Sequence, residues 1–136
     1  MQTPGGYWIL LPDWNLTKAL RNNRLRKLND IQQLTEILRR FRDERDWAQF
    51  HNAKDLAMAL NIEAAELLEV FLWKAPEQAD IDSVKEELAD VIAFALLLAD
   101  KYDLDVKQIV LEKMAKNALK YPVEKSKGSA KKYTEL

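Results

Sequence analysis

The sequence predicts an all-α fold, and three observations lead to this prediction. The chain of 136 residues contains only 3 Gly and 4 Pro, so few turns are expected. Hydrophobic residues make up 48% of the chain and charged residues 32%, which is typical of a globular domain. Between residues 29 and 121, apolar residues recur at spacings of three and four, the period of an amphipathic helix. Four helices in one domain are therefore expected.

The first half of the chain holds a leader and two of these helices. Residues 1–28 lack a sustained apolar period and are interpreted as a leader of unknown role. The first helix is expected to start at Asn29 or Asp30 and to end near residue 45. The second is expected to start after Asn52, which has Asp55 three residues on, and to end near residue 72.

The second half holds the other two helices and a tail. Ser83 followed by Glu86 resembles a capping box and predicts a third helix to about residue 102. A fourth helix is expected from Asp103 or Asp105 to Tyr121. The main domain is thus predicted over residues 29–122, followed by a flexible, basic tail over residues 123–136.

Composition excludes several kinds of chemistry. The chain has no Cys and one His, which excludes disulfides and thiol nucleophiles and disfavours imidazole metal cages. The longest apolar run, residues 91–99, is too short to cross a bilayer, and residues 7–11 are too few for a secretory signal. A cytoplasmic protein that binds neither membrane nor nucleic acid is expected. Because residues 91–99 are apolar all round their helix, one small subunit cannot easily bury them, which favours a homo-oligomer.

The net charge of -1 conceals a strong segregation of charge along the chain. Residues 61–90 carry nine acidic side chains against two basic ones, whereas residues 111–136 carry seven Lys against three Glu. Such blocks are usually solvated helix faces. The acidic block is unusual only where its carboxylates fall on an apolar face.

Two carboxylates fall in the middle of apolar stripes. A step of 100° per residue places Glu63 among Leu56, Leu60 and Leu67, with Glu66 at the edge of that stripe. The same step places Glu87 among Val84, Val91, Phe94 and Leu98. Asp90 lies at the edge of this second stripe, as Glu66 does in the first. If the two helices pack antiparallel, these four acids converge on one partly buried spot.

Four such carboxylates need a compensating cation, because burial and mutual repulsion both oppose their charged forms. Oxygen ligands favour Mg²⁺, Mn²⁺ or Ca²⁺. A di-iron site is disfavoured because its bundles use Glu-x-x-His pairs, and His51 does not follow a glutamate at that spacing. The alternative is that all four are ordinary surface acids, which is the better interpretation for Glu69 and Glu86.

Five segments together resemble the MazG-like nucleotide pyrophosphohydrolases, and in particular the short dCTP pyrophosphatase branch. They are residues 41–51 (FRDERDWAQFH), 63–66 (EAAE), 86–91 (EELADV), 113–122 (KMAKNALKYP) and 132–136 (KYTEL). The likeness covers about residues 30–136. It implies an all-α subunit of four helices that assembles into a homo-oligomeric helical bundle, commonly a tetramer whose subunits share sites. It also implies that the enzyme cleaves a deoxynucleoside triphosphate to the monophosphate and pyrophosphate. The first candidate substrate is dCTP or a related or modified pyrimidine nucleotide, and the corresponding role is house-cleaning of the nucleotide pool.

The resemblance, together with the positions of residues on the predicted helices, suggests roles for individual residues. Mg²⁺ would be held by Glu63, Glu66, Glu87 and Asp90, with Mn²⁺ able to substitute and the number of ions left open. Glu66, at the stripe edge, is the candidate for orienting or deprotonating the attacking water, with Glu63 beside it. The candidates for substrate binding are Trp47, His51, Lys54, Trp73, Phe94, Lys113, Asn117, Lys120 and Tyr121. Phe94 stands where some members have Tyr, so it offers no phenolic hydrogen bond.

Two other functions stay open at this point. A helical oligomerisation or protein-binding module would place the acids opposite Leu60 and Leu67 rather than among them. A metal-dependent phosphodiesterase acting on nucleic acid is disfavoured because no extended basic groove is evident in the core.

Overall fold

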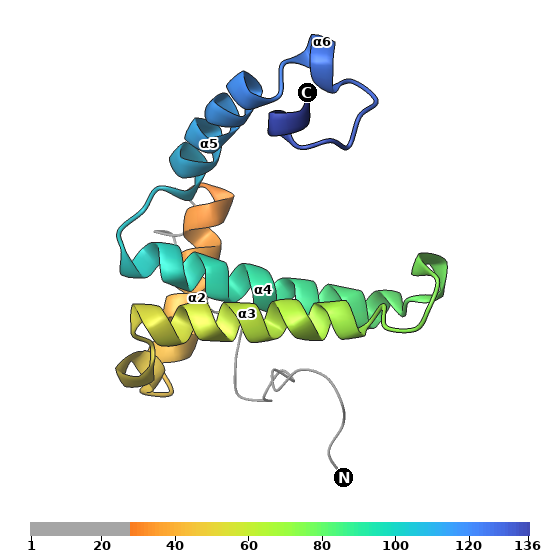
Figure 1. Ribbon diagram of the computed structural model, residues 1–136. Coiled ribbons are helices and arrows are strands. Elements are labelled where there is room, and N and C mark those ends of the chain that lie inside the picture. The colour runs from red at the N-terminus through yellow and green to blue at the C-terminus, as the bar shows by residue number, and fades with distance from the viewer. Residues whose placement is uncertain (1–27) are drawn as a thin grey trace. The chain divides into compact units, whose positions relative to one another are not determined.

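The computed structural model describes residues 28–136, and in these residues every regular element is a helix (Figure 1). The all-α prediction is therefore confirmed. The predicted leader, apart from Leu28, lies outside the described residues. None of the described helices is long and apolar enough to cross a membrane. The chain divides into two compact units, which meet in the sequence at Asp103 and Leu104 and are described separately below.

Helix α2 opens the first unit and spans Asp30–Asp43. Its start is fixed by a capping box, in which the Gln32 N–H donates to the Asn29 side chain (2.9 Å) and the Asn29 N–H donates to the Gln32 side chain (3.2 Å). The chain then turns through Asp46, which has a left-handed φ of 55°, into the 3₁₀-helix η2 (Trp47–Phe50). The predicted N-cap Asn29 is confirmed.

Helix α3 spans Ala53–Glu69 and begins as the sequence predicts. The Asn52 side chain accepts a hydrogen bond from the Asp55 N–H at 2.9 Å. The helix ends about three residues before the predicted end. The turn that follows reaches Trp73, whose φ of 59° is left-handed and stops the helical path.

Helix α4 spans Ile81–Lys101 and begins earlier than predicted, after the short helix η3 (Pro76–Gln78). Its N-cap is Asp80, whose carboxylate accepts hydrogen bonds from both the Ser83 N–H (2.9 Å) and the Ser83 hydroxyl (2.7 Å). The predicted capping box of Ser83 with Glu86 is therefore wrong. Ser83 is the third residue of the helix, and its hydroxyl is committed to Asp80.

Helices α3 and α4 lie side by side and run antiparallel, as Figure 1 shows. Leu56 of α3, which is 1% exposed, packs with Phe94 and Leu97 of α4 to form the core. Helix α2 contacts α4 and adds Leu38 to this core. The antiparallel arrangement on which the predicted carboxylate cluster depends is present.

A second tie between α2 and α4 is an ion pair. Arg39 donates two hydrogen bonds to Asp100, from Nη2 to Oδ1 (2.6 Å) and from Nε to Oδ2 (3.1 Å). Replacing Arg39 by Met should lower the free energy of unfolding by about 0.5–1 kcal/mol, because the pair is bidentate and Asp100 is largely buried. Urea unfolding checks this, with Lys85→Met as the matched control, because the Lys85–Asp82 pair is exposed and joins neighbouring turns of one helix. Equal losses in both variants would contradict the prediction.

The second unit, Leu104–Leu136, contains helix α5 (Val106–Lys120), helix α6 (Val123–Ser126) and the 3₁₀-helix η4 (Tyr133–Glu135). Of the two predicted caps, Asp105 is the one used, and its side chain accepts from the Gln108 N–H at 2.9 Å. The tail therefore contains two short helical segments that its composition does not indicate. Its chain end returns to α5, where the Tyr133 ring lies edge-on to Tyr121 with 6.0 Å between centroids.

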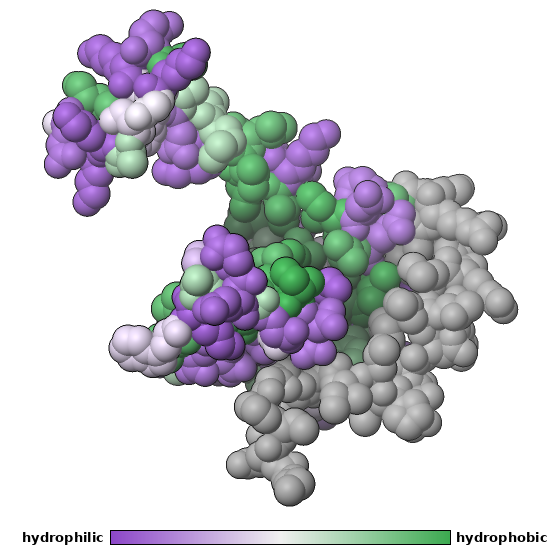
Figure 2. Space-filling model, turned by 90° about the vertical axis from the view of Figure 1, so that its right-hand side faces the viewer, coloured by the Kyte–Doolittle hydropathy of each residue, from purple (hydrophilic) through white to green (hydrophobic). Residues whose placement is uncertain are grey.

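Many apolar side chains remain exposed in a single chain, and Figure 2 shows them as green areas among the hydrophilic purple ones. On α3, Met58 and Ile62 are 53% and 52% exposed. On α4, Leu96 and Leu97 are buried while Ile92, within the same apolar run, is 46% exposed. The apolar run thus keeps an uncovered face within one chain.

Candidate functional site

Three carboxylates of the first unit converge between α3 and α4. Glu63, Glu66 and Glu87 each offer one oxygen atom, and these atoms lie within 4.8 Å of one another. Glu87 is only 4% exposed, and its Oε2 atom is buried without a hydrogen-bond partner among the described residues. An acceptor in this state needs a donor or a cation to offset its lost hydration.

Asp90 lies beside this cluster but outside the group of three. Its negative charge is one cause of the raised pKa of Glu63, which places the two carboxylates close enough to repel each other. It also lines the cavity described below. Asp90 therefore lies next to both the carboxylate cluster and the cavity.

The cluster resists full ionisation. Burial, followed by repulsion from Asp90, Glu66 and Glu87, raises the pKa of Glu63 to about 7. Burial, followed by repulsion from Glu87 and Glu66, raises the pKa of Asp90 to about 6. The pKa of Glu87 is also raised, mainly by burial. A bound cation would favour the charged forms of these carboxylates and so oppose the rise in their pKa values.

The cluster fits a hard divalent cation. Every ligand atom it offers is a carboxylate oxygen, and Mg²⁺, Mn²⁺ and Ca²⁺ prefer such ligands. The buried, unpartnered oxygen of Glu87 and the repulsion at Glu63 would both be relieved by a positive ion.

The raised pKa of Glu63 predicts a stability change with a definite sign. A carboxyl group whose pKa rises on folding contributes full stability below about pH 4.5 and loses it as the pH climbs through 7. Without metal, Glu63→Gln should therefore be more stable than the parent protein at pH 8, by about 1–2 kcal/mol after allowance for partial exposure. Urea unfolding in a chelator at pH 8 and pH 4.5 checks this. A gain of equal size at pH 4.5, or in the exposed control Glu69→Gln, would contradict it.

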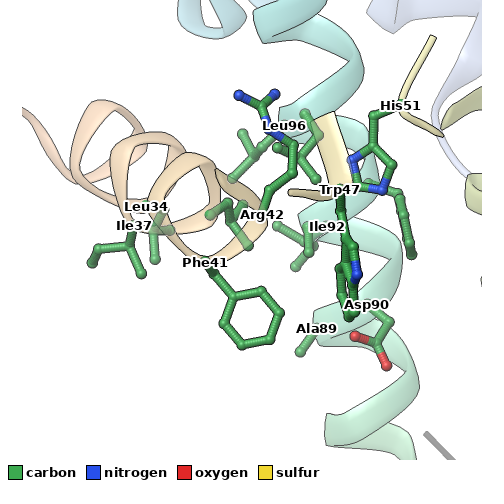
Figure 3. Close-up of a pocket in the computed structure, with 14 residues that line it drawn as sticks. Leu34, Ile37, Phe41, Arg42, Trp47, His51, Ala89, Asp90, Ile92 and Leu96 are labelled. Carbon is green, nitrogen blue, oxygen red and sulfur yellow. The ribbon is translucent and has the colours of Figure 1, made fainter. Parts of the chain in front are cut away.

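A largely apolar cavity of about 550 Å³ lies between α2, η2 and α4. Figure 3 shows Phe41 on the side of α2, with Trp47 and Asp90 on the side of α4. The volume falls in the range of small-molecule sites. Its walls are Leu34, Ile37, Leu38, Phe41, Arg42, Trp47, His51, Ala89, Asp90, Ile92, Ala93, Phe94, Leu96 and Leu97.

Three predicted substrate-binding residues, Trp47, His51 and Phe94, line this cavity. The His51 ring lies edge-on to Phe94, with 6.3 Å between centroids. Burial, with smaller contributions from Arg42 and Lys101, lowers the pKa of His51, which favours the neutral imidazole. Its Nδ1 atom is buried without a hydrogen-bond partner within the described part of the chain. His51 thus holds one buried polar atom for which the described residues supply no partner.

Two other predicted residues do not reach the cavity. Trp73 lies in the turn after α3 and is 94% exposed, and Lys54 is exposed in the first turn of α3. Their roles in substrate binding stay predictions.

The other predicted residues belong to the second unit. Lys113, Asn117 and Lys120 occur along α5 at spacings of four and three, and Tyr121 follows the helix. The Lys120 Nζ atom lies 5.0 Å from the centroid of the Tyr133 ring, a cation–π contact. The chain end therefore helps to hold Lys120.

The sequence alone does not reveal the cavity wall on α2. Leu34, Ile37 and Phe41 follow the helical apolar spacing that equally describes a core face. Arg42, a charged wall residue, is likewise missed. The only signal is the position of Phe41 and Arg42 within the segment that carries Trp47 and His51.

Comparison with known proteins gives consistent results. The model of the MazG-like family matches residues 58–136. Over 117 residues the chain is 40% identical to dCTP pyrophosphatase 1 of Bos taurus and 37% identical to that of Homo sapiens. These alignments cover 80% of this chain and 68% and 67% of the two relatives.

A solved structure is also similar. The crystal structure of a pyrophosphatase from Archaeoglobus fulgidus superposes with a TM-score of 0.65 at 38% sequence identity, covering 70% of this chain and 94% of that one. The resemblance noted from the sequence motifs is confirmed. The chain belongs to the MazG-like family, on the branch of the dCTP pyrophosphatases.

Proposed function

We propose that this hydrolase is a Mg²⁺-dependent nucleotide pyrophosphohydrolase that cleaves dCTP, or a related or modified pyrimidine deoxynucleotide, to the monophosphate and pyrophosphate. The enzyme class, a nucleoside-triphosphate diphosphatase, is that of the dCTP pyrophosphatase relatives. The observation that carries the proposal is the buried, unpartnered oxygen of Glu87 within a carboxylate cluster that borders an apolar cavity. Nucleotide-pool house-cleaning in the cytoplasm is the corresponding role.

The metal would be held by Glu63, Glu66 and Glu87, with Asp90 as the fourth ligand. A bound Mg²⁺, or Mn²⁺ in its place, would neutralise phosphate charge and lower the pKa of a bound water molecule. Four carboxylates are compatible with two or more ions per site. Glu66 orients the attacking water and accepts its proton, while Glu63 assists. Glu63 must lose its own proton before it can bind the ion, since its pKa is about 7.

The cavity would hold the nucleobase. The Trp47 ring offers a stacking surface, and such stacking is tolerant of base identity. The neutral His51 lines the cavity and can make a hydrogen bond to a base edge, and Phe94 lies in the same wall. The expected preference for a pyrimidine base is inferred from the dCTP pyrophosphatase relatives.

The triphosphate would be bound by cationic and polar side chains. Lys113, Asn117 and Lys120 of α5 supply donors for phosphate oxygens, with Tyr121 next to Lys120. Lys54 is a weaker candidate of the same kind. Trp73, which is almost fully exposed in one chain, would act only where another subunit covers it.

We infer a homo-oligomer, a tetramer built as a dimer of dimers, from the uncovered apolar side chains. Met58 and Ile62 on α3 are 53% and 52% exposed in one chain, and Leu88 on α4, which does not line the cavity, is 43% exposed. Light scattering at micromolar concentration should therefore give a mass above that of one 15.8-kDa chain. A monomer would contradict the inference and would leave Trp73 without a partner.

A protein-binding module would place its acids on the outer surface. Glu87 instead is among the most buried side chains in the described residues, and it lies on the face that packs against α3. The placement of this residue therefore supports the catalytic proposal.

Pyrophosphate release from a panel of canonical and modified deoxynucleotides, with and without Mg²⁺, tests the function. We expect Mg²⁺-dependent release, fastest with dCTP or a close analogue. Glu63→Ala serves as the inactive control, and Glu66→Gln should lose turnover while it retains the fold. Release from no nucleotide would contradict the enzyme proposal, and full turnover by Glu66→Gln would contradict the role of Glu66.

A further inference from the structure

Arg45 lies in the turn between α2 and η2, next to the cavity but not among the residues that line it. Its side chain is only 17% exposed. The guanidinium carbon lies 3.7 Å from the centroid of the Phe41 ring and 5.9 Å from that of Trp47. The catalytic proposal above gives this buried cation no role.

The contacts of Arg45 require the shape of a guanidinium. Its Nη1 donates to the backbone oxygen of Phe41 at 2.9 Å while its carbon lies over the ring of the same residue. A planar group can stack on a ring and donate in its own plane at once, which a lysine ammonium cannot do. The nearest carboxylate oxygen of Glu44 is 3.8 Å away on a side chain that is 60% exposed, so this ion pair contributes little.

These contacts fix the end of α2. The Phe41 carbonyl lies in the last turn, where the backbone tightens: the Arg45 N–H donates to Arg42, three residues back, at 3.2 Å. The Arg45 side chain adds a second contact to this turn, because its Nη1 donates to the Phe41 backbone oxygen. One residue later, Asp46 adopts its left-handed φ of 55° and reverses the chain.

The reversed chain brings Trp47 back onto Phe41. The two rings meet edge to face, with 6.0 Å between centroids and 70° between planes. Both rings form part of the cavity wall in Figure 3. Arg45 thus lies against two aromatic residues of the cavity wall without lining the cavity itself.

We propose that Arg45 is a positioning residue whose guanidinium holds the turn and the Trp47 ring in the orientation that stacks on the nucleobase. The inference rests on the proposed function only in assigning the base to Trp47. Arg45 then affects recognition of the base and leaves the carboxylate chemistry unchanged.

The test compares dCTP with 2-deoxyribose 5-triphosphate, which lacks a base. For Arg45→Met we expect the KM for dCTP to rise about three- to tenfold, with little change in kcat and no change in KM for the base-free compound. Arg45→Lys should show most of the same increase in the KM for dCTP, because it keeps the charge without the planar group. Arg40→Met is the matched control, since Arg40 pairs with Glu36 on α2 and does not line the cavity.

A double-mutant cycle separates positioning from general destabilisation. In a Trp47→Ala background, Arg45→Met should add no further increase in KM, because the residue through which it acts is gone. The proposal would be overturned if the effects of the two substitutions on KM were fully additive, or if Arg45→Met raised the KM for both triphosphates equally.

A spectroscopic readout works even without turnover. In a variant that retains Trp47 as its only tryptophan, Arg45→Met or Arg45→Lys should shift the Trp47 emission to longer wavelength, and Arg40→Met should not. An unshifted emission would overturn the positioning role. Failure of the parent protein to cleave any nucleotide would instead overturn the proposed function, so the two failures are distinguishable.

Discussion

Replacing Glu87 by Gln is expected to abolish pyrophosphate release, with a loss of about 10³-fold or more in kcat. Glu87 is the most deeply buried of the three clustered carboxylates, and one of its oxygen atoms has no hydrogen-bond partner among the described residues. An amide offers one neutral oxygen in place of a charged ligand, so both metal binding and charge neutralisation at phosphate would be lost. Steady-state pyrophosphate release with saturating Mg²⁺ measures the loss.

The adjacent residue provides the matched control. Glu86 has the same chemistry one position earlier on α4, but its side chain is exposed. Glu86→Gln should retain turnover within about twofold. Without metal, Glu87→Gln should be at least as stable as the parent, since a buried carboxyl with a raised pKa has been removed. A Glu87→Gln enzyme that keeps a tenth of parental turnover would contradict the assignment.

Replacing Trp47 by Ala is expected to raise the KM for dCTP about 10- to 100-fold. Base–aromatic stacking contributes about 1–3 kcal/mol per base, and Trp47 is the largest aromatic side chain that lines the cavity. The KM for 2-deoxyribose 5-triphosphate should not change. The comparison of the two substrates measures the stacking contribution directly.

Phe50 serves as the control for this prediction. It is an aromatic residue on the same 3₁₀-helix, but it is 62% exposed and does not line the cavity. Phe50→Ala should leave both KM values unchanged, and Trp47→Phe should recover much of the stacking. An unchanged KM for dCTP in Trp47→Ala would show that the base binds elsewhere.

The helices and their caps follow closely from local sequence. Asn29, Asn52 and Asp105 cap their helices as predicted, because each offers a side-chain oxygen at the start of an apolar period. The start of α4 was wrongly predicted because Asp80 and Ser83 are both good caps, and only the structure shows that the first binds the second. The early end of α3 depends on the backbone at Trp73, which periodicity does not report.

The convergence of Glu63, Glu66 and Glu87 was predictable because helical period places acids on an apolar face, and a short connection makes two helices antiparallel. The cavity could not be predicted from the sequence, because an apolar residue such as Ile37 has the same spacing whether it faces a core or a pocket. Arg45 was missed for a related reason. Its sequence neighbours suggest a solvated charge cluster, and the return of Trp47 onto Phe41 and Arg45 depends on the left-handed turn at Asp46.

The most direct test of the account is a ³¹P NMR spectrum of dCTP after incubation with the parent enzyme, with Mg²⁺ and with a chelator. The account predicts the resonances of a nucleoside monophosphate and of pyrophosphate with Mg²⁺, and an unchanged triphosphate spectrum with the chelator. Formation of the diphosphate and orthophosphate, or equal cleavage in the chelator, would contradict the claim that the carboxylate cluster binds a divalent cation for cleavage between the α and β phosphates.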